Sequence, residues 1–413
     1  MLKTLYITLY IILLPFVKGF CTTWQVGQGK PFQKINTAIT ACQDGDTIFV
    51  FEGIYKEYKI NINKKIMLIG VDYPIIDGQK HGEIISITAD SVVLQGFVVK
   101  NSGVASLYEP SAINAFNVRH VKIENNILED NFFGIYIQQC TNILIRRNRI
   151  TAYGKVEQSI GNGIHCWKSD NLQIVRNDIS GHRDGIYFEF VANSIIFSNI
   201  SKKNLRYGLH FMFSNDDTYV NNYFEANGAG LAVMYSKKVA MYNNTFKRSN
   251  GDASYGILLK ELSDAEIIGN TFENNTSALF LEGANRIMIK KNRFLNNGWA
   301  LKIQANCMDN IVEENNFQNN TFDVSTNGTL VLSKFKDNYW DRYEGYDLDN
   351  DNKGDIPYRP LSLYSIIIDN NPIAMLLYRS FMVTLLDRTE KLIPSITPED
   401  FRDDYPRMKP HDL

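Results

Sequence analysis

Three side chains able to bind a soft metal recur at spacings that would place them on one surface. His210 and Met212 lie two residues apart in an alternating apolar run, and Met234 occupies the position of Met212 in the next such run. Residues two apart in a β-strand point to the same side. Imidazole and thioether groups favour copper over hard cations, and methionine is a flexible ligand. If the two runs are neighbouring strands, the three residues predict a Cu(I) site.

Two other interpretations of these methionines remain open. They could form an apolar ladder that a loop covers, or they could belong to a surface that contacts a partner protein, because an exposed apolar column is itself typical of an interaction site. Equivalent outward positions in nearby runs add aromatic and charged groups, which we interpret as a ligand or partner face. These are His165, Trp167, Tyr187, Glu189 and Lys260.

The same outward positions also allow an enzyme. With Asp184 and Arg206 they could supply a base and a charge-neutralising cation for a lyase, hydrolase or epimerase that acts on an acidic polysaccharide. The sequence offers no tight pair of carboxylates and no long basic row for a polyuronate. An enzyme is therefore the alternative to a binding protein, and a structural adhesin is a third possibility.

A second group of candidate metal ligands lies further along the chain. Alternating acids in a turn-rich loop can offer several carboxylate oxygens to Ca²⁺. The EF-hand pattern is incomplete, since Asn352 stands where glycine is expected and Tyr358 where glutamate is expected. A solvated acidic turn is the alternative. The acids are Asp347, Asp349, Asp351 and Asp355.

A repeat must position all of these residues. Its first half is Asn, any residue, then Ile, Phe or Trp, and successive asparagines lie mostly 22 or 23 positions apart; one repeat, near Asn199, is imperfect. Its second half begins with Gly or Ala followed by alternating apolar residues. The first halves begin at Asn125, Asn148, Asn177, Asn222, Asn244, Asn270, Asn292, Asn315 and Asn338. The second halves begin at Gly134, Gly163, Gly185, Gly208, Gly230, Gly256, Ala278 and Ala300.

This period predicts a parallel β-helix. Each repeat holds two or three short runs with period-2 alternation, and none is long enough for a helix. Coils of strands stack about 4.8 Å apart, so one turn residue per coil forms a column. Asparagine suits this column because it tolerates a left-handed backbone and its amide can bond to the coils above and below.

Composition limits the class and the compartment. The chain has 413 residues, 44% of them hydrophobic, and a net charge of −2, which gives no support for nucleic-acid binding. Residues 1–20 resemble an export signal, with Lys3 before the apolar run 5–17. A lipid anchor at Cys21 or a retained membrane anchor is the alternative. A Cys21–Cys42 disulfide is compatible with an oxidising compartment.

We expect four segments. They are the signal peptide at 1–20, an N-terminal cap and first coils at 21–110, central repeats at 111–340, and an acidic loop, helix and tail at 341–413. An amphipathic pattern over 31–43 predicts the cap helix, because open β-helix ends need covering. A helical pattern over 372–392 predicts either a C-terminal cap or a docking helix for a membrane partner, followed by an extended tail.

Several strings resemble the NosD family. They include residues 206–215, 230–236 and 256–262, and the most specific is the block from Trp340 to Pro360. The resemblance covers nearly the whole chain after the signal. It implies a right-handed parallel β-helix of the pectin-lyase-like type.

The resemblance also implies a role. Members of this family are accessory proteins that work in the periplasm with an ABC transporter, built from an ATPase and a membrane permease. They help to assemble the copper–sulfur cluster of nitrous oxide reductase. For this chain the resemblance therefore implies copper or sulfur as cargo, and apo nitrous oxide reductase and a copper chaperone as partners. It implies peripheral association with the inner membrane through the transporter.

Overall fold

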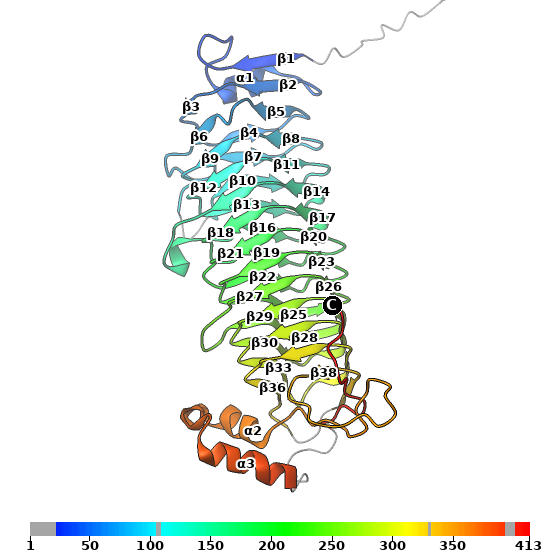
Figure 1. Ribbon diagram of the computed structural model, residues 1–413. Helices are drawn as coiled ribbons and strands as arrows, with labels where there is room; N and C mark the ends of the chain where they lie inside the picture. The colour runs from blue at the N-terminus through cyan, green and yellow to red at the C-terminus, as the bar shows by residue number, and fades with distance from the viewer. Residues whose placement is uncertain (1–21, 105–108, 329–331, 393–400) are drawn as a thin grey trace, which may run out of the picture.

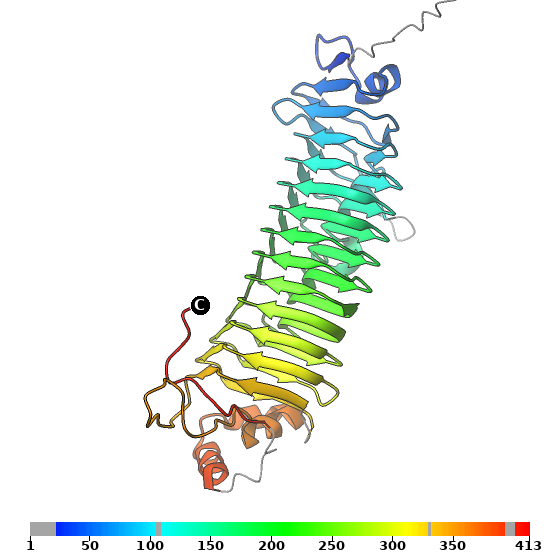
Figure 2. The ribbon, with the colours of Figure 1, turned by 90° about the vertical axis from the view of Figure 1, so that its right-hand side faces the viewer.

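Stacked coils of parallel strands form a long column (Figures 1 and 2). The computed structural model describes residues 22–104, 109–328, 332–392 and 401–413. All strand-to-strand ladders are parallel, and strands about one repeat apart pair in register, for example β22 with β25. This arrangement confirms the predicted parallel β-helix.

Each coil contributes strands to three faces. The first face comprises β4 (Ile60–Ile62), β7 (Ile85–Ile87), β10 (Ser111–Phe116), β13 (Phe133–Gln138), β16 (Ile164–Trp167), β19 (Ile186–Glu189), β22 (Tyr207–Met212), β25 (Ala229–Lys237), the start of β28 (Tyr255–Ile268), β30 (Ser277–Glu282), β33 (Trp299–Ile303) and β36 (Phe322–Ser325). The second face comprises β1 (Thr23–Val26), β2 (Thr47–Val50), β5 (Met67–Gly70), β8 (Val93–Gln95), β11 (Lys122–Glu124), β14 (Thr141–Arg146), β17 (Asp170–Val175), β20 (Ile195–Phe197), β23 (Thr218–Val220), β26 (Ala240–Tyr242), the end of β28, β31 (Asn285–Lys290), β34 (Met308–Glu313) and β37 (Leu332–Lys336). The third face comprises β3 (Ile54–Tyr55), β6 (Ile75–Asp77), β9 (Val98–Lys100), β12 (Ile127–Glu129), β15 (Arg149–Thr151), β18 (Asp178–Ser180), β21 (Ile200–Lys202), β24 (Tyr223–Glu225), β27 (Thr245–Lys247), β29 (Thr271–Glu273), β32 (Arg293–Leu295), β35 (Asn316–Gln318) and β38 (Tyr339–Trp340).

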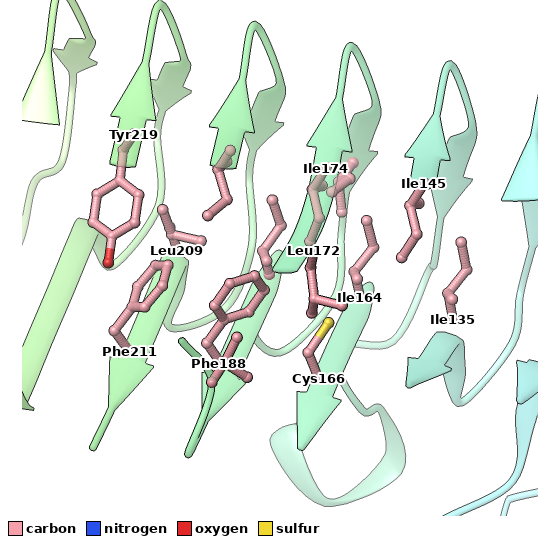
Figure 3. Close-up of a cluster of buried hydrophobic side chains, with 14 of the residues drawn as sticks. Ile135, Ile145, Ile164, Cys166, Leu172, Ile174, Phe188, Leu209, Phe211 and Tyr219 are labelled. Atoms are coloured by element: carbon pink, nitrogen blue, oxygen red, sulfur yellow. The ribbon is translucent and has the colours of Figure 1, made fainter. Parts of the chain in front are cut away.

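The inward side chains form one continuous core. Figure 3 shows Cys166, Phe188 and Phe211 on consecutive coils, pointing toward Tyr219 and the isoleucines of the second face. On the third face a stack of rings runs from Phe224 to Trp340, with neighbouring centroids 4.0–5.2 Å apart. Three glycines of the repeat lie against this stack, namely Gly208, Gly230 and Gly256. A Cβ on Gly256 would lie 2.5 Å from the Ala278 carbonyl oxygen and 2.9 Å from the Phe272 ring, so a side chain there would force its neighbours to shift.

The predicted asparagine column exists and is buried. In each step the side-chain oxygen of one asparagine accepts from the backbone N–H and the Nδ2 of the asparagine one coil before, as Asn244 does from Asn222 at 2.9 Å each. The expected left-handed backbone is wrong for the ladder residues. The residue before each of them has the positive φ, for instance Asn243 at 54°. The column comprises Asn126, Asn148, Asn177, Asn199, Asn222, Asn244, Asn270, Asn292, Asn315 and Asn338.

Two repeats differ from the sequence pattern. The first repeat is displaced by one residue, because Asn126 rather than Asn125 enters the ladder and Leu128 pairs with Ile150. The imperfect repeat keeps its ladder residue, Asn199, and replaces the buried apolar residue with Ser201. The Ser201 hydroxyl donates to the Gly208 carbonyl at 2.7 Å. A buried polar side chain is thus tolerated because it is hydrogen-bonded.

Both ends of the described column carry additional structure. The cap helix α1 (Ile35–Ala41) lies within the predicted range 31–43 and buries Ile35, Ala38 and Ile39. At the other end the single predicted helix over 372–392 is wrong in detail. The chain forms α2 (Leu363–Asn370), the 3₁₀-helix η2 (Pro372–Leu377) and α3 (Phe381–Leu392), with Arg379 at φ 63° between the last two.

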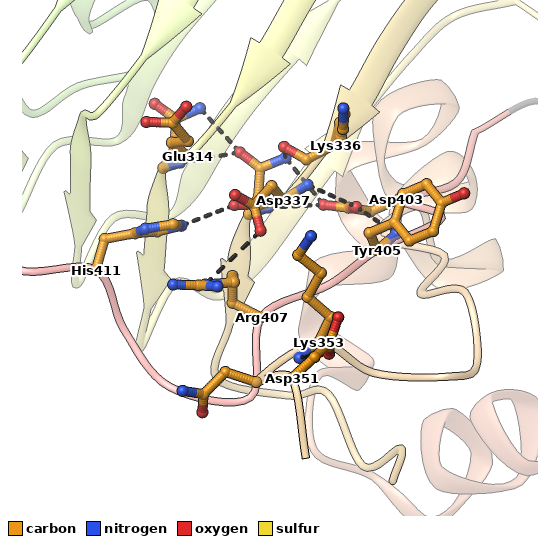
Figure 4. Close-up of polar contacts among 12 residues, drawn as sticks. Glu314, Lys336, Asp337, Asp351, Lys353, Asp403, Tyr405, Arg407 and His411 are labelled. Carbon is orange, nitrogen blue, oxygen red and sulfur yellow. Dashed lines mark hydrogen bonds and ion pairs between the residues drawn. The ribbon is translucent and has the colours of Figure 1, made fainter. Parts of the chain in front are cut away.

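The end of the chain packs against the last coils. Asp403 is fully buried, and its Oδ2 accepts from Asn338 Nδ2 at 2.9 Å and from Trp340 Nε1 at 3.1 Å. A carboxylate thus ends the asparagine ladder. Figure 4 shows Asp403 beside Asp337 and Lys336 of the last coil. His411 lies further back along the column, where its Nε2 is 2.7 Å from the Asp337 carbonyl oxygen. The predicted tail is therefore extended but held against the coils over residues 401–413.

Some sequence-based expectations fall outside the described residues. These are the signal peptide at 1–20 and Cys21. Cys42 is a buried free thiol. Among the described residues, no helix is long and apolar enough to cross a membrane.

The asparagine ladder gives the first prediction. Asn244→Ala removes the acceptor of two Asn222 donors and the donor to the Tyr219 carbonyl oxygen. We expect a loss of about 2–4 kcal/mol, because these groups become buried without partners. Chemical denaturation measures the change. Asn36→Ala in α1 is the control, because Asn36 is only partly buried and lies outside the ladder. An equal effect of both substitutions would contradict the role of the ladder.

Candidate functional site

The three predicted copper ligands line one wall of the first face. His210 and Met212 lie on β22 and Met234 lies on β25, where it pairs directly with Met212. His210 pairs with Ala232 on the next coil, and both residues are buried. Both methionines are half-buried. The structure therefore confirms the predicted alignment, while copper ligation itself stays a prediction.

His210 belongs to a stack of alternating tyrosine and histidine rings. The ring centroids are 4.6 Å apart for Tyr136 and His165, 4.8 Å for His165 and Tyr187, and 4.8 Å for Tyr187 and His210. The sequence predicted His165 as an outward residue of a ligand or partner face, and it does lie in the column of His210. It is nevertheless only 6% exposed, and among the described residues neither ring nitrogen has a hydrogen-bond partner. Large outward rings on adjacent coils cover one another, so an outward position is not necessarily an exposed one.

Burial fixes the charge of this histidine. Desolvation, together with the nearby positive charge of Arg183, lowers the pKa of His165 to about 3. The ring is therefore neutral at neutral pH, and it packs edge-on against Phe133 at 5.2 Å. Burial likewise raises the pKa of Tyr187 to about 12, so its hydroxyl keeps its proton.

Two contacts orient the candidate ligands. The His210 Nδ1 atom lies 3.5 Å from Asp184 Oδ2, and both side chains are almost fully buried. The Tyr187 hydroxyl lies 3.5 Å from Met212 Sδ and donates to it. The imidazole thus belongs to the buried aromatic stack, and the two thioethers beside it are only half-buried. Soft ligands that can exchange in this way suit a Cu(I) ion that is bound and then released.

The residues predicted as a partner face share the columns of the candidate ligands. His165 and Tyr187 lie in line with His210, and the other three lie in line with the methionine pair. Trp167 pairs with Glu189, Glu189 with Met212, and Met234 with Lys260. The methionine pair is therefore bracketed by an acidic and a basic residue. Lys260 forms an ion pair with Glu282 at 3.3 Å, which leaves little net charge at that end.

An exposed aromatic row beside the methionines was missed from the sequence. Phe190, Phe213 and Tyr235 immediately follow Glu189, Met212 and Met234, and they are 39–47% exposed. Their rings stack with centroids 5.1 and 5.2 Å apart. All three have left-handed φ angles near 54°, which disfavour bulky residues. The sequence could have indicated this row, because these three aromatic residues stand at the turn position after the first-face strand. Other coils carry a polar residue there, namely Gln139, Lys168 or Glu261.

The acidic loop brings together three of its four predicted ligands. One carboxylate oxygen from each of Asp347, Asp349 and Asp351 lies within 4.8 Å of the others. Asp355 instead accepts from the Leu348 backbone N–H at 2.8 Å. The Asp347 carboxylate also has hydrogen bonds within the loop, since it accepts from the backbone N–H groups of Asp351 and Asn352. The calcium site stays a prediction.

The enzyme alternative draws on the same region. Asp184 lies between His210 and Arg206, whose Nε is 4.0 Å from Asp184 Oδ1. A carboxylate, an imidazole and a guanidinium in one place could in principle move a proton.

Comparison with known proteins gives a sequence match. The family described as "Periplasmic copper-binding protein (NosD)" matches residues 147–348. The chain is 26% identical over 355 residues to "Probable ABC transporter binding protein NosD" of Stutzerimonas stutzeri, covering 81% of this chain and 80% of that protein. The protein of the same name from Pseudomonas aeruginosa is 27% identical over 358 residues, covering 81% and 82%.

Solved structures share the fold. The surface adhesin PfbA of Streptococcus pneumoniae matches with a TM-score of 0.53 at 15% identity, over 74% of this chain and 85% of that one. The catalytic domain of a GH87 α-1,3-glucanase matches with a TM-score of 0.60 at 11% identity, over 77% and 69%. An adhesin and a hydrolase on one architecture show that this fold does not determine function.

Burial of His165 predicts a pH effect on stability. A histidine in the unfolded chain titrates near pH 6.5, whereas the folded pKa is about 3. The unfolded state therefore binds the proton first, and the contribution present above pH ~6.5 is lost as the pH falls toward about 3.

The test compares wild type with His165→Phe. The wild type should lose stability between neutral pH and pH ~5 more steeply than the variant, by up to about 1.4 kcal/mol per pH unit. Urea unfolding at several pH values measures both slopes. Parallel slopes would show that His165 is not buried in its neutral form.

Proposed function

The chain belongs to the NosD family, and on this basis we propose that it is a non-catalytic periplasmic accessory protein that handles copper together with an ABC transporter. The family description supports copper and the periplasm, and the names of both relatives support the transporter. The finer proposal is that the protein takes part in assembling the copper–sulfur cluster of nitrous oxide reductase. Apo-reductase would receive the cargo and a copper chaperone would supply it.

The methionine pair beside His210 is the observation that carries this proposal. Met212 and Met234 lie on adjacent paired strands, so their thioethers can approach one ion without movement of the backbone. His210 lies two residues from Met212 on the same face and offers an imidazole nitrogen as a third ligand. Two weak ligands and one stronger ligand suit a site that must release its ion to an acceptor.

The exposed aromatic row supports a protein partner at the same place. Phe190, Phe213 and Tyr235 present apolar surface next to the methionines, and surface of this kind is typical of a contact site. A partner seated on this row would exclude water from the copper ligands. Direct transfer of Cu(I) between proteins needs such an arrangement, because free Cu(I) would otherwise enter the solvent.

The copper site is tested by its methionines. Met212→Leu together with Met234→Leu removes both thioethers and keeps the apolar volume. We expect Cu(I) affinity, measured by competition with a chromophoric chelator, to fall by about two orders of magnitude while the circular dichroism spectrum stays unchanged.

The matched control replaces two methionines elsewhere. Met288 and Met308 point outward from the second face, on β31 and β34. Changing both to leucine should leave Cu(I) affinity as in wild type. If the two double variants bind copper alike, the ladder of Met212 and Met234 is not the site.

The role in cluster assembly is tested in the organism. Deleting the gene should leave nitrous oxide reductase exported but without its catalytic copper–sulfur cluster. Metal and sulfide analysis of the purified reductase measures this result. Restored cluster content with the Met288/Met308 control variant, but not with the Met212/Met234 variant, would connect the phenotype to the copper site. A deletion strain with fully active reductase would contradict the proposal.

A further inference from the structure

A buried carboxylate lies beside the imidazole of His210. Asp184 is 1% exposed and His210 is 5% exposed. Asp184 Oδ2 lies 3.5 Å from His210 Nδ1, and among the described residues neither ring nitrogen of His210 has a hydrogen-bond partner. Both nitrogens are buried, but their surroundings differ. Nδ1 faces an anion, whereas the hydrogen-bonding capacity of Nε2 is unused.

Asp184 is held in place independently of His210. Its Oδ1 atom accepts from the Tyr207 backbone N–H at 3.3 Å and lies 4.0 Å from Arg206 Nε. Tyr207 also packs against the His210 ring, with centroids 4.7 Å apart. The backbone of β22 and the Arg206 side chain thus fix the Asp184 carboxylate without using the His210 side chain. The other carboxylate oxygen, Oδ2, is the one near the His210 ring.

A neutral imidazole carries one proton, so its position decides which nitrogen can donate electrons to a metal. A carboxylate near Nδ1 stabilises the tautomer with the proton on that atom, and the lone pair then lies on Nε2. The separation of 3.5 Å is longer than a formed hydrogen bond. A small rotation of the ring would shorten it, and polar contacts in ligand-free sites often shorten when the ligand binds.

We propose that Asp184 is a positioning residue for copper, which accepts the Nδ1–H of His210 and so presents Nε2 as the ligand atom. This inference rests on the copper function proposed above. It also gives Asp184 a role other than that of an acid or base in catalysis. The carboxylate never contacts the ion, and its effect is transmitted through the ring.

The first measurement concerns the tautomer and needs no copper. Histidine labelled with ¹⁵N gives distinct long-range ¹H–¹⁵N correlations for the two tautomers, and His210→Gln identifies which signals belong to that ring. In the spectrum of the neutral ring we expect the wild-type His210 proton on Nδ1. A proton on Nε2 in wild type would overturn the inference, whatever the fate of the copper site.

The second measurement is Cu(I) affinity. Asp184→Asn should lower it by about 10- to 100-fold and shift the His210 tautomer toward Nε2–H, and Asp184→Glu should restore part of both. Asp178→Asn is the control, because Asp178 forms an ion pair with Lys202 at the surface at 3.3 Å. If Asp184→Asn fails to fold, the position of the His210 proton in the wild-type protein still tests the positioning role.

The outcomes separate the two proposals. Unchanged copper affinity in His210→Gln would remove His210 from the proposed copper site. Reduced affinity in His210→Gln with wild-type affinity in Asp184→Asn would keep the copper site and overturn the positioning role.

Discussion

The alignment of each coil on the next is the constraint on which this structure depends. Backbone hydrogen bonds of the parallel ladders hold the coils together, and the asparagine ladder fixes their lateral position. Each amide both accepts from the coil before and donates to the coil after, as Asn222 does between Asn199 and Asn244. A slip by one residue would leave a row of buried amides without partners. This cost keeps Met212 beside Met234, although the two are far apart in the chain.

The period and the alternation of the repeat were enough to predict the β-helix and the strand register. Met212 faces Met234 because each lies at the same distance from the Gly that begins its strand, and that spacing is visible in the sequence. The first repeat was misaligned because Asn125 and Asn126 are adjacent, and the pattern alone could not identify the ladder residue. A second ladder, which includes Asn204 and Asn227, was overlooked although it follows the first at a constant spacing.

The sequence was less informative about burial. Alternation shows that His165 points outward, but its exposure depends on the size of the side chains on the adjacent coils. Tyr136, Tyr187 and Phe133 pack around it and exclude water. The contact between Asp184 and His210 was unpredictable for a related reason. It joins residues at different positions of the repeat, and it depends on side-chain orientation rather than on register.

We propose that side chains from successive coils form one copper-binding wall. X-ray absorption spectroscopy of the Cu(I)-loaded protein tests it most directly, because the fine structure distinguishes sulfur from nitrogen neighbours. We predict two sulfur scatterers and one nitrogen scatterer in wild type, and loss of the sulfur contribution when Met212 and Met234 are both leucine. A copper environment without sulfur, or one that the double substitution leaves unchanged, would contradict the claim.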